Sequence, residues 1–498
     1  MSTLSITPQN SVVGRKVSNT SAPSIVVVGA GAAGLAAAVE AREAGAPCVV
    51  LEAFPSPGGA GATAGGGVCI VGTPLQQAAG VEDSVELALR DWLAIGGPDV
   101  DVDWARYYLK HSLEDVYRWA ETTGVRFKRL EHYEGNSVPR IHFPEGGGAE
   151  IIERLFARAL QLGAAFRPST VAVELIRNDS GITGVVVSGP DGGSQIEAGA
   201  VVVATGGFCN DHERLLRLLG PWSEGERLLC GGALQARGLG HDLLARVGAR
   251  FAFLDHVFIY APGTPDPDDP AGLRGLTVRT PPGGVVVNPA GHRIYDETLV
   301  GFVSSGRALM AQQPRTSRLV FDADGAATLQ IGEPGYRRGN VPIREKIDEF
   351  LNRSAHVHRS PTLDGLASAA GVDRIGLKAT IASFNRWVAD GIERDPAFGR
   401  KLGSAQQLAR PPFYAIEFYP LARKSLGGVV TDMSCRVLDG NGHVIPGLFA
   451  AGEVAGMAGG HINGSAGLEG TMIAPSILAG RIAGRTAAAE TLQPANSR

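Results

Sequence analysis

The chain has 498 residues, of which 44% are hydrophobic and 19% charged, and its formal net charge is −4. This length suits two or three domains around a large core. The slightly acidic balance, without a run of Lys or Arg, excludes nucleic acid as an expected partner. No apolar stretch reaches the roughly 18 residues of a spanning helix without glycine or charge, so we expect no transmembrane segment.

The N-terminal residues and the cysteines indicate the compartment. Residues 1–23 are rich in Ser, Thr, Asn and Pro and have no apolar h-region, so we expect a disordered tail and no signal peptide. The five cysteines are scattered and form no C-x-x-C pair, which argues against a redox dithiol, a zinc site and a disulfide framework. We therefore expect buried thiols in a reducing cytoplasm.

A glycine motif follows the first apolar run of the chain. Residues 24–53 read SIVVVGAGAAGLAAAVEAREAGAPCVVLEA, which predicts a strand, a Gly-rich turn, a helix and a second strand. Gly29, Gly31 and Gly34 have the G-x-G-x-x-G spacing, which provides a tight turn, room for a pyrophosphate and close helix packing. Glu52 stands 18 residues beyond Gly34, where an acid binds ribose hydroxyls. The unit therefore predicts a dinucleotide site.

Two later strands identify the dinucleotide. VVVATGG (201–207) and PGLFAAGEVAG (446–456) each join an apolar run to small residues. Three strands converging on one ligand suit an extended FAD. No second strand–G-x-G-x-x-G–helix unit is present to hold NAD(P)H. We therefore expect a resident flavin.

The remaining segments predict an α/β fold with an insertion. Helical periodicity marks 82–125 and 147–166, and an antiparallel meander follows them. Prolines and aromatics then cluster, and we expect an α+β capping or catalytic domain at 246–412. This domain interrupts a Rossmann-type, glutathione-reductase-like FAD domain formed by 24–245 and 413–498. The active site is expected at the junction.

From residue 24 onward the chain resembles the fumarate reductase/succinate dehydrogenase flavoprotein superfamily, and it is most similar to the 3-ketosteroid dehydrogenase and tricarballylate dehydrogenase-like branch. The resemblance rests on the glycine motif, VVVATGG, GVVVNPAGHRIYDE (284–297), the segment 427–456 and the final Gly-rich loop and helix. Some relatives link flavin covalently to a histidine in the early loop. Residues 55–72 contain none, so noncovalent FAD is expected.

The resemblance implies where FAD binds. The glycine motif and Glu52 would hold the ADP half, and the loop 58–67 would follow the pyrophosphate and isoalloxazine. Glu453 would hold the ribityl chain, and the backbone of 467–472 would approach the pyrimidine edge. The full set of expected positions is Gly29, Gly31, Ala32, Ala33, Gly34, Glu52, Ala53, Gly58, Gly59, Ala60, Thr63, Ala64, Gly66, Gly67, Val171, Ala204, Thr205, Gly206, Gly452, Glu453, Gly467, Gly470, Thr471 and Met472.

The superfamily moves a hydride between flavin N5 and a carbon near a carbonyl or carboxylate, and exchanges a proton at the neighbouring carbon. Fumarate reductases use a donor arginine and further arginine and histidines that clamp two carboxylates. Here YDETLVGF (295–302) lacks the donor, and HINGSAGLEGT (461–471) lacks the clamp arginine. Arg423 and Lys424 replace the usual His–Thr before a Gly-Gly pair. These departures argue against dicarboxylate reduction.

The expected catalytic groups are an electrophile and a base. Ketosteroid Δ1-dehydrogenases polarise the ketone with a tyrosine, and His461 or Asn463 would replace it here. The base candidates are Tyr260, His256 and Tyr295.

Neighbouring cations could assist that base. Arg293 or Arg423 could lower the pKa of a tyrosine, and Arg423 with Lys424 could instead be a solvated pair. Each histidine or tyrosine candidate also has a packing alternative. Arg140 and His142 either belong to the site or brace a loop.

The sequence thus predicts an FAD-dependent dehydrogenase that introduces a C=C bond beside the carbonyl of a cyclic ketone or related compound. Its partners would be that small substrate and an external electron acceptor, which is a quinone, a flavin or a redox protein. The alternatives are an ene-reductase of an unsaturated acid or enone, an FAD monooxygenase or oxidase, and a non-catalytic FAD-binding protein.

Overall fold

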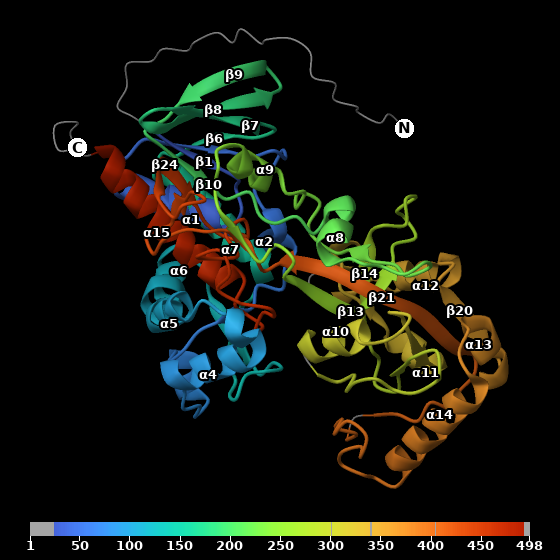
Figure 1. Cartoon of the computed structure of the whole chain (residues 1–498). Helices are drawn as coiled ribbons and strands as arrows, with labels where there is room; N and C mark the ends of the chain where they lie inside the picture. The colour runs from blue at the N-terminus through green and yellow to red at the C-terminus, as the bar shows by residue number, and fades with distance from the viewer. Residues whose placement is uncertain (1–23, 300, 339–340, 404, 493–498) are drawn as a thin grey trace.

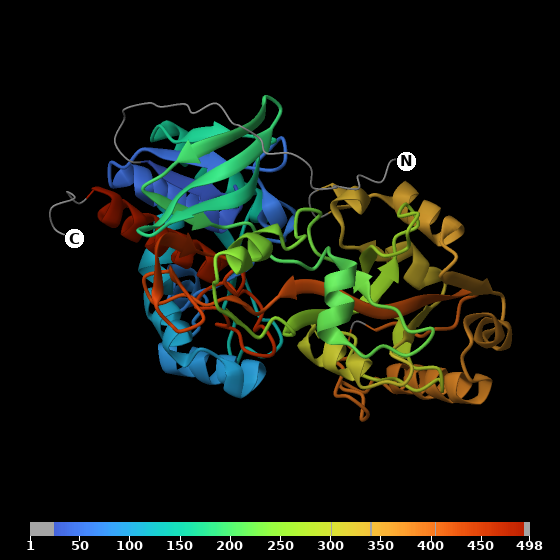
Figure 2. The same ribbon diagram turned by 45° about the horizontal axis from the view of Figure 1, so that its top comes forward.

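The computed structural model describes residues 24–299, 301–338, 341–403 and 405–492, and the predicted tail, 1–23, lies outside them. The described chain forms two lobes, each built on its own main sheet (Figures 1 and 2). In this part of the chain no helix is long and apolar enough to cross a membrane.

The first lobe contains a six-stranded sheet in the order β23-β24-β10-β1-β2-β6. All neighbours pair in parallel except β23 and β24. Strand β1 is buried along its whole length, as its run of β-branched residues predicts for a strand covered on both faces. The strands are β1 (Ile25–Val28), β2 (Cys48–Leu51), β6 (Ala165–Arg167), β10 (Ala200–Val203), β23 (Arg436–Leu438) and β24 (Val444–Ala450).

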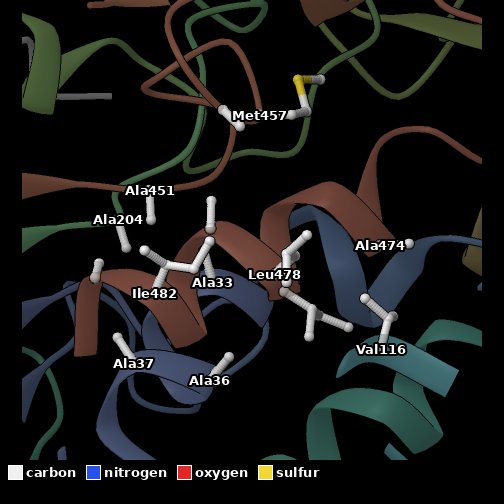
Figure 3. Packing of buried hydrophobic residues seen from close by; sticks show 14 of the residues in the cluster. Ala33, Ala36, Ala37, Val116, Ala204, Ala451, Met457, Ala474, Leu478 and Ile482 are labelled. Carbon is white, nitrogen blue, oxygen red and sulfur yellow. The ribbon is translucent and has the colours of Figure 1, made fainter. Parts of the chain in front are cut away.

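Two helices pack together beside this sheet, α1 (Ala32–Glu43) and α15 (Ile473–Leu492). Figure 3 shows alanines of α1 facing larger apolar side chains of α15, among them Leu478 and Ile482. An added Cβ at Gly480 or Gly484 would clash with the backbone of Ala33 or Ala37. Glycine at these positions therefore allows the last helix of the chain to lie directly against the helix of the dinucleotide motif.

Other elements of this lobe include the predicted antiparallel meander, which pairs β7, β8 and β9. A second small sheet has the order β3-β5-β4. The elements are α2 (Gly59–Thr63), β3 (Val68–Cys69), α3 (Pro74–Ala78), α4 (Val85–Gly96), η1 (Gly97–Asp99), α5 (Val102–His111), η2 (Ser112–Arg118), α6 (Trp119–Thr122), β4 (Phe127–Glu131), β5 (Ile141–Pro144), α7 (Gly147–Gln161), β7 (Val171–Asn178), β8 (Gly181–Gly189) and β9 (Gly192–Glu197).

The second lobe, which we call the cap, is built on an eight-stranded sheet. Its order is β15-β16-β21-β13-β14-β17, and β11 and β20 also pair with β21. The strands are β11 (Leu229–Cys230), β13 (Val257–Pro265), β14 (Gly275–Arg279), β15 (Val285–Val287), β16 (Ser317–Phe321), β17 (Gln330–Ile331), β20 (Val357–Ser360) and β21 (Phe413–Ser425).

Helices surround the cap sheet, and β18 pairs with β19 in this lobe. Helix α9 and the small ribbon of β12 and β22 pack instead against the sheet of the first lobe. These elements are α8 (His212–Leu219), α9 (Leu239–Arg246), β12 (Phe251–Ala252), α10 (Val303–Met310), α11 (Ala323–Thr328), η3 (Pro334–Tyr336), β18 (Arg337–Arg338), β19 (Val341–Pro342), α12 (Arg344–Arg353), α13 (Leu363–Ala370), α14 (Arg374–Ala389) and β22 (Gly428–Val429).

Strand pairing suggests different domain boundaries from those expected. Strand β21 pairs with β13 and β16 of the cap, although the expected boundary at 412/413 assigns it to the FAD domain. Strand β11 also pairs with β21, ahead of the expected boundary at 245/246. We therefore propose that the cap includes β11 and ends with β21, whereas the intervening α9 and β12 pack against the first lobe.

Candidate active site

The glycine motif forms an open turn at the end of β1. Gly29 has φ +108°, and an added Cβ would clash with the carbonyl of Ala204. At Gly34 the added atom would clash with the carbonyl of Gly29. At Gly31, in contrast, no heavy atom lies within 4 Å of the Cβ position. Two glycines therefore serve close packing, and Gly31 leaves open backbone where a pyrophosphate is expected.

Residues distant in sequence surround this turn. Gly58 donates its N–H to the carbonyl of Ala30 at 3.0 Å, which places the early Gly-rich loop beside the motif. An added Cβ at Gly452 would lie 2.8 Å from Cβ of Ala33. Gly206, after β10, has open space around its Cβ position. The three predicted strand ends therefore converge, which gives a cradle whose open positions fit an extended dinucleotide.

Glu52 is buried beside the same turn. Its Oε2 accepts a hydrogen bond from the N–H of Ala30 at 2.9 Å, and its Oε1 accepts one from Phe54 at 2.9 Å. Thr170 donates its N–H to the Glu52 carbonyl at 2.7 Å, which places Val171 nearby. Glu52 thus fixes the turn and brings negative charge to the expected ribose position.

Some expected cofactor positions contribute packing instead. An added Cβ at Gly66 would lie 2.5 Å from Gly147, and one at Gly67 would lie 2.9 Å from Ile141 and Phe143. These glycines allow their loop to approach β5 and α7. The remaining positions lie in or near α2 or follow the converging strands, and they are Ala32, Ala53, Gly59, Ala60, Thr63, Ala64 and Thr205.

The final Gly-rich loop is braced internally. Asn463 is fully buried, donates to the carbonyl of Thr471 at 3.2 Å and accepts from the Thr471 hydroxyl at 2.7 Å. Cys69 donates its N–H to the carbonyl of Gly470 at 2.9 Å. An added Cβ at Gly467 would meet the side chain of Met472. Asn463 therefore has its hydrogen-bonding groups engaged within the loop, which disfavours it as the electrophile.

Glu453 lies where β21 enters the first lobe. Its Oε1 accepts hydrogen bonds from the backbone N–H and hydroxyl of Ser425, at 2.9 and 3.0 Å. Burial raises the pKa of this carboxyl, and the two Ser425 hydrogen bonds oppose the rise. Glu453, which is expected to hold the ribityl chain of FAD, is therefore fixed beside the last residue of β21.

Tyr260 and Lys424 form a hydrogen-bonded pair inside the cap sheet. Lys424 Nζ donates to Tyr260 Oη at 3.0 Å and lies 5.1 Å from the ring centre of Phe258. Burial lowers the pKa of Lys424, but the opposing charges of Tyr260 and Glu469 outweigh it, so the net shift is upward. Phe302 stacks on Tyr260 with ring centres 3.9 Å apart. A cation thus faces a largely buried phenol oxygen.

Arg423 adds a second cation to this pair. Its guanidinium carbon lies 5.6 Å from the ring centre of Tyr260, and its Nη1 lies 3.3 Å from Oε1 of Glu333. Burial raises the pKa of Glu333, and Arg423 counteracts this rise. The predicted Arg423–Lys424 pair is therefore engaged by site residues and is not simply solvated.

The two histidine candidates contact one aromatic ring at the lobe junction. Phe253 stacks on His256, with centres 4.7 Å apart, and meets His461 edge-on at 5.0 Å. His461 Nδ1 lies 3.0 Å from the carbonyl oxygen of Asp99, and His256 Nδ1 lies 3.1 Å from that of Gly464. Because a carbonyl only accepts, both Nδ1 atoms carry the proton. Each Nε2 therefore donates only as an imidazolium.

Tyr295 lies in the cap core, where burial, followed by the charge of Glu297, raises its pKa. This environment keeps the phenol protonated and disfavours it as a base. Arg293 does not assist it, since its guanidinium bonds Glu297 at 2.6 and 2.8 Å and Asp395 at 3.1 Å.

Arg140 and His142 brace the first lobe. Arg140 is fully buried and bonds both oxygens of Asp83 at 2.7 Å and Asp91 at 2.8 Å. His142 Nε2 lies 2.7 Å from the Thr73 hydroxyl, and burial lowers the His142 pKa to about 4. The loop-bracing interpretation is favoured for both residues.

A cavity of about 300 Å³ opens in the cap, and neither Tyr260 nor Lys424 is among its lining residues. Phe302 both lines this cavity and stacks on Tyr260. Pro262, Leu299 and Tyr295 add further apolar surface, and Arg279 is also in the lining. The cavity is large enough for a small cyclic compound.

Sequence reasoning missed three residues of this arrangement: Phe302, Glu333 and Glu469. The only signal for Phe302 was its place in the segment where a donor arginine was sought. Glu469 was the one acid in the final Gly-rich loop, and its charge could have been noticed. Glu333 lies 90 residues from Arg423 in sequence, and no local pattern marks it.

Residues 24–473 match the FAD binding domain family, and the chain belongs to this family. It is 30% identical over 475 residues to a fumarate reductase (cytochrome) of Shewanella frigidimarina, and the alignment covers 93% of this chain and 76% of the relative. It is 28% identical over 552 residues to a KsdD-like steroid dehydrogenase of Mycolicibacterium smegmatis, covering 94% and 99%.

A solved structure of 3-ketosteroid-Δ4-(5α)-dehydrogenase from Rhodococcus jostii RHA1 is similar, with a TM-score of 0.71 and 26% identity over 94% of this chain and 96% of that one. These findings confirm the expected superfamily, the α/β fold and FAD as cofactor. The chain is an FAD-dependent oxidoreductase of the class acting on CH–CH groups, with reductases and dehydrogenases as relatives.

Proposed function

We propose that this chain desaturates a cyclic ketone or related carbonyl compound, with Tyr260 as the base. The observation that carries the proposal is the hydrogen bond from Lys424 Nζ to Tyr260 Oη at 3.0 Å. A cation at this distance stabilises negative charge on the phenol oxygen in a water-poor site. The similarity to a steroid dehydrogenase over nearly its full length supports this direction.

In the proposed reaction the substrate loses one proton and one hydride from adjacent carbons and gains a C=C bond. Bound FAD supplies the acceptor for the hydride. The Tyr260 phenolate takes the proton from the carbon next to the carbonyl and becomes neutral. Lys424 remains protonated throughout and holds the phenol oxygen in place. We propose the imidazolium of His461 as the group that stabilises negative charge on the carbonyl oxygen.

The second candidate is the reverse reaction, reduction of an enone or unsaturated acid. Neutral Tyr260 would then donate the proton that the phenolate accepts in the forward direction. The 30% identity to a fumarate reductase favours this candidate. The absence of the donor and clamp arginines from 295–302 and 461–471 weighs against it.

We propose further that FAD is bound noncovalently, since 55–72 contain no histidine. Reduced enzyme would pass its electrons to an external quinone, flavin or redox protein. All five cysteines are buried and unpaired, which supports a reducing cytoplasmic location.

The test is an anaerobic titration of purified protein that follows the visible flavin band. Saturated 3-ketosteroids and simpler cyclic ketones are added without another electron acceptor. Bleaching by a saturated ketone is expected, and Tyr260→Phe should bleach at least a hundredfold more slowly. If no ketone bleaches the band, but an enone reoxidises chemically reduced protein, the reductase candidate replaces the first.

A further inference from the structure

Glu469 occupies a rigid position in the final Gly-rich loop. The Gly470 carbonyl is tied to Cys69, as described above, and Thr471 donates its N–H to the carbonyl of Leu468 at 3.2 Å. Gly470 has φ +83°, and an added Cβ there would lie 2.7 Å from the Cys69 nitrogen. The backbone on both sides of Glu469 is therefore fixed, and its side chain leaves the loop in a defined direction.

Glu469 is a partly buried residue, but one of its carboxylate oxygens is buried. Its Oε1 has no solvent exposure and no hydrogen-bond partner among the described residues. A buried carboxylate oxygen without a donor destabilises the protein, because it has lost its hydrogen bonds to water. One explanation for such an atom is a donor that binds from outside the chain.

Two residues, one of them in the candidate site, lie within electrostatic reach of this carboxylate. Its negative charge acts on Lys424 and on Tyr133. Gly135, two residues beyond Tyr133, lies close to the final Gly-rich loop, because an added Cβ there would lie 2.9 Å from the side chain of Leu468. The segment that contains Tyr133 and Gly135 therefore packs against this loop. Glu469 therefore lies near both that segment and Lys424.

The neighbouring cations have other acceptors. Lys424 donates to Tyr260, and Arg423 is paired with Glu333. Neither is within ion-pair distance of Glu469 in the described structure, so the charge of Glu469 is not neutralised by a direct contact. An anionic substrate group placed beside it would be repelled, and a donor group would satisfy the open oxygen.

We propose that Glu469 determines substrate specificity by accepting a hydrogen bond from a neutral donor group, such as a hydroxyl, and by excluding carboxylates. This inference rests on the proposed function, because it assigns the substrate class of the same site. It selects neutral hydroxylated carbonyl compounds over oxo acids.

The experiment uses FAD-loaded protein and three ring probes that differ at one carbon. They are cyclohex-2-enone, 4-hydroxycyclohex-2-enone and 4-oxocyclohex-2-ene-1-carboxylate. Dissociation constants are obtained from changes in the oxidised flavin spectrum, so no turnover is required. The variants are Glu469→Gln, which removes the charge, and Glu469→Leu, which also removes the acceptor. The control is Glu131→Gln, because Glu131 also acts on Tyr133 but is half-exposed and paired with Arg129.

The wild type and the Glu131→Gln control should bind the hydroxyl probe best and the carboxylate weakest. In Glu469→Gln we expect carboxylate binding to tighten about tenfold or more relative to cyclohex-2-enone. Glu469→Leu should in addition lose the preference for the hydroxyl probe. These ratios would support the inference even if no ketone bleached the flavin. A failure of ketones to bleach the flavin would refute only the proposed function.

Unchanged ratios in both variants would overturn the inference, as would an equal change in the control. Loss of FAD or an altered flavin band without a change in the ratios would also overturn it, since Glu469 would then serve the cofactor. If no probe binds to any of the proteins, the inference and the proposed substrate class both fail.

Discussion

Replacing Lys424 by methionine tests the base assignment most directly. The substitution keeps a similar apolar stem beside Phe258 and removes the ammonium that lies 3.0 Å from Tyr260 Oη. Hydrogen bonds to charged groups contribute about 1.5–3 kcal/mol, which corresponds to about a 10- to 150-fold loss in kcat/KM. Because the cation favours the ionised phenol, its loss should also move the rising, low-pH limb of activity to higher pH.

The assay is kcat/KM for ketone oxidation across pH with an artificial electron acceptor. Lys346→Met is the matched control, because Lys346 is an exposed cap lysine paired with Glu349. It should leave both the rate and the pH profile unchanged. If Lys424→Met loses rate uniformly without moving the low-pH limb, Lys424 acts only as a packing or binding residue. If the rate is retained, Tyr260 is not the base.

The remaining predictions concern four substitutions in the first lobe. Gly31→Val should retain the fold, since its side chain enters open space, but should lower FAD affinity at least tenfold in an ultrafiltration assay. Gly34→Val should instead lower the melting temperature of the apoprotein, because its Cβ meets backbone, and equal melting of the two variants would refute this distinction. Arg140→Met should cost about 3–5 kcal/mol in urea unfolding by leaving buried carboxylates unpaired, and a loss below 1 kcal/mol would contradict it. Burial depresses the pKa of His142 from 6.5 to about 4, so its contribution to stability should fall as pH drops from 6.5 towards 4, by up to about 1.4 kcal/mol per unit. His142→Gln should flatten that dependence in chemical denaturation, and an unchanged slope would assign it to other groups.

Local motifs in the sequence were sufficient to predict the dinucleotide cradle. Gly29, Gly31 and Gly34 act over six residues, and the physical demands of a strand–turn–helix unit determine their spacing. Glu52 could also be predicted, because a second strand of ordinary length delivers it to the turn. Their roles depend on backbone geometry, which short sequence patterns encode well.

The catalytic arrangement depends on contacts between distant residues, and the sequence could only suggest candidates for it. Tyr260 and Lys424 are 164 positions apart, and their pairing requires the register of two cap strands. Asn463 was an attractive electrophile as a polar residue in a Gly-rich loop, but its partner Thr471 engages it within the same loop. The place of β21 in the cap was also hidden, since strand partners are not visible in a single sequence.

The register of β13 and β21 also has a mechanical consequence. Phe258 is paired with Lys424 across these two strands, so the phenol and its cation belong to one sheet. A change in the angle between the lobes would therefore carry Tyr260 and Lys424 together as one rigid body. Only their separation from Glu469 and from the glycine cradle would vary. The proposed acid–base pair is therefore preassembled within the cap, and a movement of one lobe against the other would change its approach to the cradle without separating its two members.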